Sequence, residues 1–127
     1  MNDFTALGFL KILTEKFPHT PTVKQGMALN KLANFVLEGK KDDVFLLKGF
    51  AGTGKTTLVA TLVSSLWKVK MSSVLMAPTG RAAKVMSVYS GNKSFTIHKK
   101  IYFPKKQSGG GIQFVLAPNK HRNTVFI

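Results

Sequence analysis

The N-terminal forty residues place apolar and polar positions with the spacing of two amphipathic helices. The first is predicted over residues 4–17 and is closed by Pro18. Its expected apolar face consists of Phe4, Leu7, Leu10 and Leu13. Thr20 and Pro21 predict the N-cap and first residue of a second helix that ends at Gly39. Its expected apolar face consists of Val23, Met27, Leu32, Phe35 and Val36.

From residue 44 onward, short apolar runs alternate with helical patterns. The runs 44–48 and 73–77 have the length and character of buried strands, and helical patterns follow them over 54–67 and 80–88. The apolar face of the first of these helices consists of Leu58, Leu62, Val63 and Leu66. This alternation predicts a parallel sheet with right-handed crossovers. Since ligands bind at the carboxyl ends of such strands, we expect Gly49 and residues 78–80 to share one edge.

The last third of the chain has the pattern of a hairpin followed by one more strand. After a polar linker over 90–94, Thr96 is placed to cap a short helix. Two β-prone runs, 101–103 and 112–116, flank a segment that we interpret as the mobile basic tip of a hairpin. Residues 124–127 have the character of the start of a buried strand. Because domains seldom end on such a strand, we interpret the chain as part of a larger protein.

Composition bounds the size and the environment of the protein. At 127 residues and 44% hydrophobic content, the chain has the size of one domain. It contains no cysteine, which argues against a disulfide framework or thiolate metal site and favours a reducing compartment. No apolar stretch approaches the roughly 18 residues of a membrane span, and the N-terminus lacks the basic start of a signal peptide. We therefore expect a soluble, cytoplasmic protein with no membrane partner.

The charge of the chain is strongly positive. The sequence has 19 Lys and Arg against five Asp and Glu, a net charge of +14, so polyanions are the expected partners. Charge alone leaves nucleic-acid binding and nonspecific attraction equally open. The five carboxylates are Asp3, Glu15, Glu38, Asp42 and Asp43, so residues 44–127 contain none. We expect the last two to lie in a solvated turn before the first strand.

Residues 49–57 read GFAGTGKTT and fit the pattern GxxxxGK(S/T) between a predicted strand and a predicted helix. In this pattern the glycines let backbone N–H groups point inward, Lys55 reaches the β- and γ-phosphates, and the Thr56 hydroxyl joins a Mg²⁺ shell. The helix dipole adds to this attraction. An ordinary Gly-rich turn is the alternative interpretation. The residues expected around the phosphates are Gly49, Ala51, Gly52, Thr53, Gly54, Lys55, Thr56 and Thr57.

The distribution of carboxylates limits what this chain can catalyse by itself. A P-loop NTPase ordinarily uses an Asp on a neighbouring strand to hold Mg²⁺ and an acidic or Gln residue to orient the attacking water. No carboxylate follows position 43. We therefore expect binding with negligible turnover, although Lys55 belongs to the catalytic site of the whole enzyme.

The ordered set of motifs resembles superfamily 1 DNA helicases of the RecD/Dda-like (1B) group. The set consists of Gln25, GFAGTGKTT, APTGRAAKVM from Ala77, TIH from Thr96, a hairpin, and TVFI from Thr124. The resemblance covers roughly residues 20–127. It implies an α/β fold, a partial RecA-like P-loop NTPase domain with a central parallel sheet, N-terminal helices and an inserted β-hairpin. The implied parts are a helical segment (1–43), a P-loop core (44–100), the hairpin (101–118) and the start of the Walker B strand (119–127).

The resemblance implies roles for individual residues. Gln25 corresponds to the glutamine that reads adenine, because a side-chain amide can accept from N6 and donate to N7. An exposed helix glutamine is the alternative. Phe17 and His19 are candidates to stack near the base, and packing on the second helix is the alternative for Phe17. We expect Trp67 to pack in the core or at its rim.

The implied contacts to single-stranded DNA come from two motifs. They involve Pro78, Thr79, Gly80 and Arg81, and then Thr96 and His98. A hydroxyl, helix-start N–H groups and a guanidinium suit phosphate oxygens, and a histidine ring can stack on a base or donate to phosphate. Surface cations and a structural histidine are the alternatives. The hairpin corresponds to a pin that splits duplex DNA, or is a surface ribbon.

The implied parent protein is an ATP- and Mg²⁺-dependent helicase that moves 5′ to 3′ along single-stranded DNA and opens ss/ds junctions, in repair or recombination. The remainder of the helicase chain would complete its site with an arginine from a second domain. The rival interpretation is a noncatalytic basic nucleic-acid-binding module whose loop grips phosphate. A small-molecule kinase is a weaker rival, because it leaves the two DNA motifs unexplained.

Overall fold

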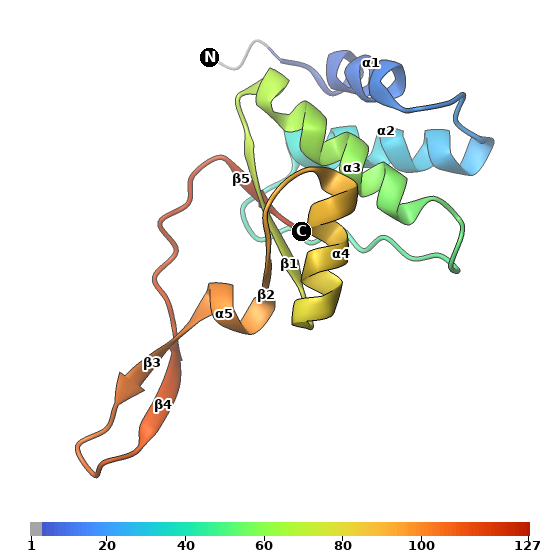
Figure 1. Ribbon diagram of the computed structural model, residues 1–127. Coiled ribbons are helices and arrows are strands. Elements are labelled where there is room, and N and C mark those ends of the chain that lie inside the picture. Colours follow the sequence, from blue (N-terminus) through green and yellow to red (C-terminus); the bar gives the residue numbers. More distant parts are fainter. Residues whose placement is uncertain (1–3) are drawn as a thin grey trace. The chain divides into compact units, whose positions relative to one another are not determined.

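The computed structural model describes residues 4–127, which form two compact units that meet in sequence between Ser72 and Ser73. The N-terminal unit is helical, and the C-terminal unit contains a small parallel sheet, two helices and a hairpin (Figure 1). The predicted α/β class with a parallel sheet is therefore confirmed. None of the helices in the described part of the chain is both long enough and apolar enough to cross a membrane.

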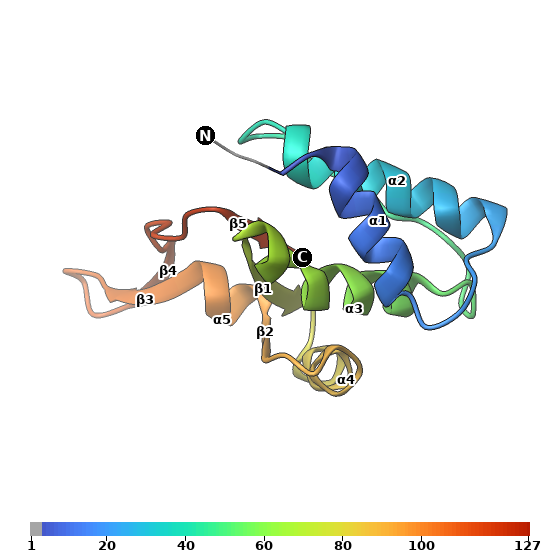
Figure 2. The same cartoon turned by 90° about the horizontal axis from the view of Figure 1, so that it is seen from above.

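Three helices build the core of the N-terminal unit. Helix α1 (Ala6–Lys16) runs across α2 (Val23–Glu38) and also contacts α3 (Lys55–Ser65), as Figure 2 shows from above. Helix α3 continues into the 3₁₀ turn η1 (Leu66–Val69). The buried apolar side chains of this unit are Phe9, Leu13, Phe17, Leu29, Leu32, Ala33, Val36, Leu58, Leu62, Val63, Leu66 and Val69. The apolar face predicted for the helix after the P-loop is confirmed.

The apolar face predicted for the first helix is confirmed at Leu13 and wrong at Leu7. Phe9, Leu13 and Phe17 point into the core, whereas Leu7 is 77% exposed. Residues four apart share one face of a helix, and Leu7 lies about 200° around the axis from Phe9. The helix begins after Thr5, whose hydroxyl accepts a hydrogen bond from the Gly8 N–H at 3.0 Å.

The second helix begins two residues later than predicted, with Thr22 rather than Thr20 as its N-cap. The Thr22 hydroxyl accepts from the Gln25 N–H at 3.2 Å, and the Gln25 side-chain carbonyl accepts from the Thr22 N–H at 3.0 Å. This reciprocal capping box satisfies two helix-end donors at once, which the Thr20–Pro21 alternative cannot do. Of the predicted apolar face, Leu32 and Val36 are buried as expected, whereas Val23 and Met27 are exposed. Leu29, which was not predicted, is buried instead.

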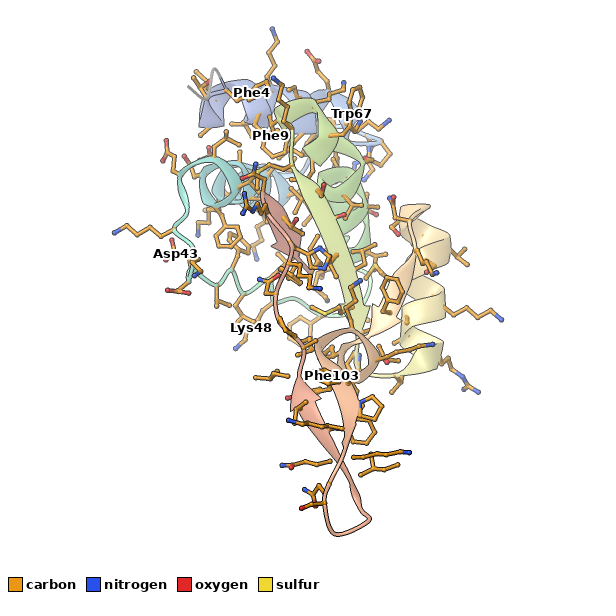
Figure 3. All side chains as sticks on the ribbon, turned by 90° about the vertical axis from the view of Figure 1, so that its left-hand side faces the viewer. Phe4, Phe9, Asp43, Lys48, Trp67 and Phe103 are labelled. Carbon is orange, nitrogen blue, oxygen red and sulfur yellow. The ribbon has the colours of Figure 1, made fainter. Side chains whose placement is uncertain are left out.

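Residues 44–48 do not form the predicted strand. They run as an extended segment without strand pairing in the described part of the chain, and Asp43 and Lys48 mark its ends in Figure 3. Val44 is 88% exposed and Leu46 is 72% exposed, while the Phe45 ring packs edge-on against Phe35. A strand requires a hydrogen-bonding neighbour, and the described part of the N-terminal unit contains no other strand for it.

The turn before this segment and the end of η1 complete the N-terminal unit. The Asp43 carboxylate accepts from the Lys40 N–H at 2.8 Å, which confirms the predicted polar turn. Trp67 is 69% exposed, so its predicted packing is wrong. The three-residue period of the 3₁₀ turn directs Leu66 and Val69 inward and leaves Trp67 outside.

The C-terminal unit is built on a three-stranded sheet in the order β2-β1-β5. Its strands are β1 (Ser72–Ala77), β2 (Ser94–Thr96) and β5 (Thr124–Phe126). Strand β2 pairs parallel to β1, with Ala77 opposite Thr96. Ile127 donates to the Val74 carbonyl at 2.8 Å and accepts from the Met76 N–H at 2.6 Å, a pattern typical of parallel strands. The sequence did not predict β2, because a three-residue strand is too short to show an alternating pattern.

Helix α4 (Gly80–Ser90) packs against β2, and the short helix α5 (Ile97–Ile101) follows β2 directly. The hairpin strands β3 (Tyr102–Lys106) and β4 (Ile112–Leu116) then extend away from the sheet (Figure 1). They are antiparallel, with Pro104 opposite Phe114. The predicted hairpin and short helix are both confirmed, and β3 extends three residues further than expected.

Candidate nucleotide and nucleic-acid sites

The first part of the P-loop (residues 49–57) curls around the side chain of its own lysine. The Lys55 ammonium donates to the Phe50 carbonyl at 2.8 Å and also to the Gly49 carbonyl. The same Phe50 carbonyl accepts from the Thr53 hydroxyl at 2.7 Å and from the Thr53 N–H at 3.3 Å. The ammonium thus lies within the loop, where the sequence predicted the phosphates.

Two glycines of this loop occupy positions that other residues cannot take without strain. Gly54 has φ +88°, a left-handed conformation that disfavours any residue with a Cβ. A Cβ on Gly49 would lie 2.8 Å from the Thr53 hydroxyl oxygen. The glycine pattern read from the sequence therefore corresponds to a real steric requirement of this backbone.

The N-terminus of α3 supplies further hydrogen-bond donors. Gly54 is its N-cap and provides no side-chain cap, and the first intrahelical bond is donated by the Leu58 N–H to the Gly54 carbonyl at 2.9 Å. The N–H groups of Lys55, Thr56 and Thr57 therefore have no partner within the helix. Together with the Lys55 ammonium, they can bind an anion with several oxygens.

Gln25 lies beside this loop although it comes from another helix. Its side-chain nitrogen is 2.8 Å from the position that a Cβ on Gly54 would occupy. Its carbonyl oxygen is at the same time held by the capping box of α2. The structure thus brings Gln25 and the P-loop together, as the sequence hypothesis required.

The comparison with known families agrees with this geometry. Residues 34–125 match the AAA domain family over most of the chain. The chain belongs to that family. This AAA domain therefore carries a nucleotide-binding P-loop, the one formed by residues 49–57. No curated protein and no solved structure gives a significant match.

The two predicted DNA motifs of the AAA domain lie side by side in the C-terminal unit. Strands β1 and β2 are parallel neighbours, and their last residues, Ala77 and Thr96, are register partners. Residues 78–81 and 97–98 follow these strand ends directly, so both motifs start at the same edge of the sheet. Whether this edge also faces the P-loop stays a prediction.

The threonines of both motifs are N-caps. The Thr79 hydroxyl accepts from the Ala82 N–H and the Thr96 hydroxyl accepts from the Lys99 N–H, both at 3.2 Å. Each hydroxyl keeps its own proton as a donor. Pro78, Thr79, Gly80 and Arg81 are exposed, which leaves them accessible to a ligand. Their predicted contact with DNA stays a prediction.

All three histidines have aromatic neighbours within the protein, and two of them, His19 and His98, belong to the predicted sites. The His98 ring packs edge-on against Phe114, with centroids 4.6 Å apart, and lies 5.1 Å from Tyr102 at the base of the hairpin. His19 contacts Phe17, which is buried against the helices, so the stacking of Phe17 on a base is wrong. His98 remains exposed despite these contacts and can still donate a hydrogen bond.

The sequence hypothesis missed one residue of this region, Thr22. The signal was present, because Thr22 and Gln25 have the spacing of a capping box. No group of three or more candidate metal ligands among His, Cys, Asp and Glu occurs in the described part of the chain.

Proposed function

We propose that this AAA domain is the ATP- and single-stranded-DNA-binding part of a DNA helicase of the RecD/Dda-like group. The observation that carries the proposal is the P-loop itself, with an ammonium inside it and three free helix N–H groups beside it. This donor set suits a triphosphate, which is polyanionic and presents many acceptor oxygens.

The residues present fit ATP with Mg²⁺ in part. Lys55 would bind the β- and γ-phosphates and the Thr56 side chain, which is exposed at the start of α3, would contribute a hydroxyl to the metal. Bound Mg²⁺ would neutralise phosphate charge. The carboxylates closest in sequence to the P-loop are Asp42 and Asp43. They precede the extended segment 44–48, at the end opposite the loop, and the Asp43 carboxylate is engaged in the turn. We therefore expect this chain to bind ATP without appreciable hydrolysis.

The proposed DNA-binding surface belongs to the C-terminal unit. Residues 73–127 contain nine Lys and Arg and no Asp or Glu. Two helix N-termini, capped by Thr79 and Thr96, start from adjacent strand ends. Free hydroxyl protons, helix N–H groups and cations are the groups that contact a phosphate backbone. A helicase domain that tracks one strand would use such a surface.

Titration calorimetry with ATP and Mg²⁺ tests the nucleotide half of the proposal. Lys55→Ala should weaken binding by about tenfold to a hundredfold, because charge-assisted hydrogen bonds are lost. Lys68→Ala removes an exposed lysine of the same unit and should leave the affinity unchanged. Equal affinities of wild type and Lys55→Ala would refute a phosphate site at this loop.

Fluorescence anisotropy with labelled single-stranded DNA tests the other half. The affinity should fall steeply between 50 and 200 mM salt, by about tenfold or more, because phosphate contacts release counterions. An affinity that does not depend on salt would argue against a surface that follows the DNA backbone.

The second candidate is a noncatalytic nucleic-acid-binding module, which the absence of carboxylates after residue 43 favours. Both candidates bind DNA, so the nucleotide decides between them. A basic module would bind ATP and inorganic phosphate with similar weak affinity, whereas the helicase domain should prefer ATP strongly.

A further inference from the structure

The single tryptophan of the chain, Trp67, is exposed and belongs neither to the P-loop nor to the DNA motifs. It is 69% exposed, whereas its neighbours in η1, Leu66 and Val69, are almost completely buried. These two side chains anchor the turn in the core of the N-terminal unit, and the Lys70 N–H donates to the Trp67 carbonyl at 3.1 Å. The backbone of Trp67 is therefore held in place while its ring faces the solvent.

The exposure of this ring is informative because tryptophan is highly buried on average and is enriched at interfaces. A tryptophan side chain is rigid, so it loses little conformational freedom when a partner covers it. A ring with 69% of its surface accessible has at least one face open to a partner. The Trp67 ring thus has the properties of a binding surface rather than of a core residue displaced by chance.

Two lysines give this surface its charge. Lys68 and Lys70 are exposed on the same turn, and the Lys68 ammonium lies 5.8 Å from the centroid of the Trp67 ring. Residues 44–127 contain no carboxylate, so no close neighbour along the chain neutralises these lysines. A partner that complements the surface has a flat group that stacks on the indole and a negative charge that lies near the ammonium groups.

Single-stranded nucleic acid combines these two features. An unpaired base presents a π-face, and stacking on an aromatic side chain accepts any base. The phosphates on either side of that base carry the charge that the lysines attract. A neutral apolar protein surface would cover the indole but would place no charge beside the two ammonium groups.

The Trp67 surface is remote from the P-loop. Both adjoin the continuous element formed by α3 and η1, but the P-loop precedes its first residue and Trp67 lies near its end (Figure 3). The helix between Lys55 and Trp67 is about 20 Å long. Phosphates bound at the P-loop would therefore lie too far away to contact the indole.

We propose that Trp67, together with Lys68 and Lys70, forms a second contact site for single-stranded nucleic acid, in which one unpaired base stacks on the indole. This site uses only residues of the N-terminal unit, so it is independent of the DNA motifs in the C-terminal unit.

The fluorescence of Trp67 tests this site directly, because no other tryptophan contributes to the signal. Titration with oligothymidylate should quench the indole emission as a base stacks on the ring. An abasic oligonucleotide of the same length has the same phosphates without bases and should leave the emission nearly unchanged. Equal quenching by both strands, or no quenching at oligothymidylate concentrations that saturate binding in anisotropy, would overturn the proposal.

The affinity for labelled oligothymidylate, measured by anisotropy, is the second readout. Trp67→Ala should weaken binding by about tenfold, and Trp67→Phe, which keeps a smaller ring, by about threefold or less. Val23→Ala removes an apolar side chain that is 83% exposed on α2 of the same unit, and it should leave the affinity unchanged. Equal affinities of wild type and Trp67→Ala would contradict a stacking role.

Arg81→Ala separates this site from the DNA-binding surface of the C-terminal unit. The variant should bind DNA more weakly, yet at saturating oligothymidylate its Trp67 emission should be quenched as strongly as in wild type. If wild type binds DNA while Trp67 is neither quenched nor required, the second site is refuted and the proposed function stands. If wild type binds no DNA at all, the second site and the DNA half of the proposed function both fail.

Discussion

The two units of the chain differ in what holds them together and in what they offer to a ligand. The N-terminal unit has most of the buried apolar side chains, including fully buried Phe9, Leu13, Leu29 and Leu66, and the chain up to Ser72 carries all five carboxylates. The C-terminal unit buries only Val74, Leu75, Ala77 and Ala83 among its apolar residues, and it has no carboxylate.

Under the proposed function, the difference corresponds to two kinds of binding site. A phosphate cradle needs donors fixed to within fractions of an ångström, and a well-packed set of helices provides such a scaffold. A surface that follows a nucleic-acid backbone depends mainly on charge, which tolerates a thin sheet and an exposed hairpin. The comparison therefore predicts that packing defects harm the first unit most and that charge changes harm the second.

The largest expected effect is on folding stability. Leu29→Ala leaves a cavity among the helices of the N-terminal unit and should lower the free energy of unfolding by about 2–5 kcal/mol. Met27→Ala on the same helix removes a side chain that is 55% exposed, and the change should stay within about 0.5 kcal/mol. Urea unfolding followed by circular dichroism measures both. Similar losses for the two variants would contradict the core assigned to this unit.

A pair of glycine substitutions tests the P-loop conformation. Gly54→Ala forces a Cβ into a left-handed backbone and to 2.8 Å from the Gln25 nitrogen, so it should destabilise by about 1–2 kcal/mol and weaken ATP binding. Gly26→Ala lies inside α2 with no atom near its added Cβ, and should stabilise by about 0.5–1 kcal/mol. The changes in unfolding free energy of the two variants, measured by thermal or urea unfolding, should have opposite signs. A stable Gly54→Ala protein would show that the loop has another conformation.

A charge change in each unit sharpens the contrast in DNA binding. Arg81→Ala should reduce the slope of log affinity against log salt by about 1, because one phosphate contact is lost. Lys31→Ala removes an exposed cation from α2 and should leave that slope unchanged. Anisotropy titrations over several salt concentrations give both slopes. Equal changes would mean that the positive charge of the whole chain, rather than the C-terminal unit, attracts DNA.

The smallest effect is expected at His98. His98→Phe keeps an aromatic ring against Phe114 but removes the ring N–H, so folding stability should hold while DNA affinity falls by about twofold to tenfold. His98→Ala removes the packing as well and should lower both. Unchanged DNA binding by His98→Phe would assign this histidine a purely structural role.

Local patterns sufficed for most of this fold. The helix after the P-loop, strand β1 and the hairpin follow from apolar spacing and turn residues that are close in sequence. Residues 44–48 and 94–96 were misassigned because strand formation depends on a neighbour, and a neighbour is a property of the tertiary structure. The first run is apolar and has no partner strand among residues 4–127, whereas the second is short and pairs with β1.

The candidate site was predictable where its residues are contiguous in the sequence. Lys55 and the glycines of its loop follow from a contiguous motif whose chemistry is local. Gln25 lies beside Gly54 because α2 packs against α3, and the sequence placed Gln25 at the nucleotide only through the family resemblance. Thr22 is the N-cap because of a reciprocal pair of hydrogen bonds with Gln25, which the spacing of the two residues indicates but does not establish.

The unpaired stretch before the P-loop has a practical consequence. Residues 44–48 present a row of backbone donors and acceptors beside the exposed side chains of Val44 and Leu46. Such a row is a template onto which a β-strand of another molecule can add, and repeated addition produces aggregates. Concentrated solutions of this chain should therefore precipitate over time, and a lysine in place of Val44 is the simplest remedy.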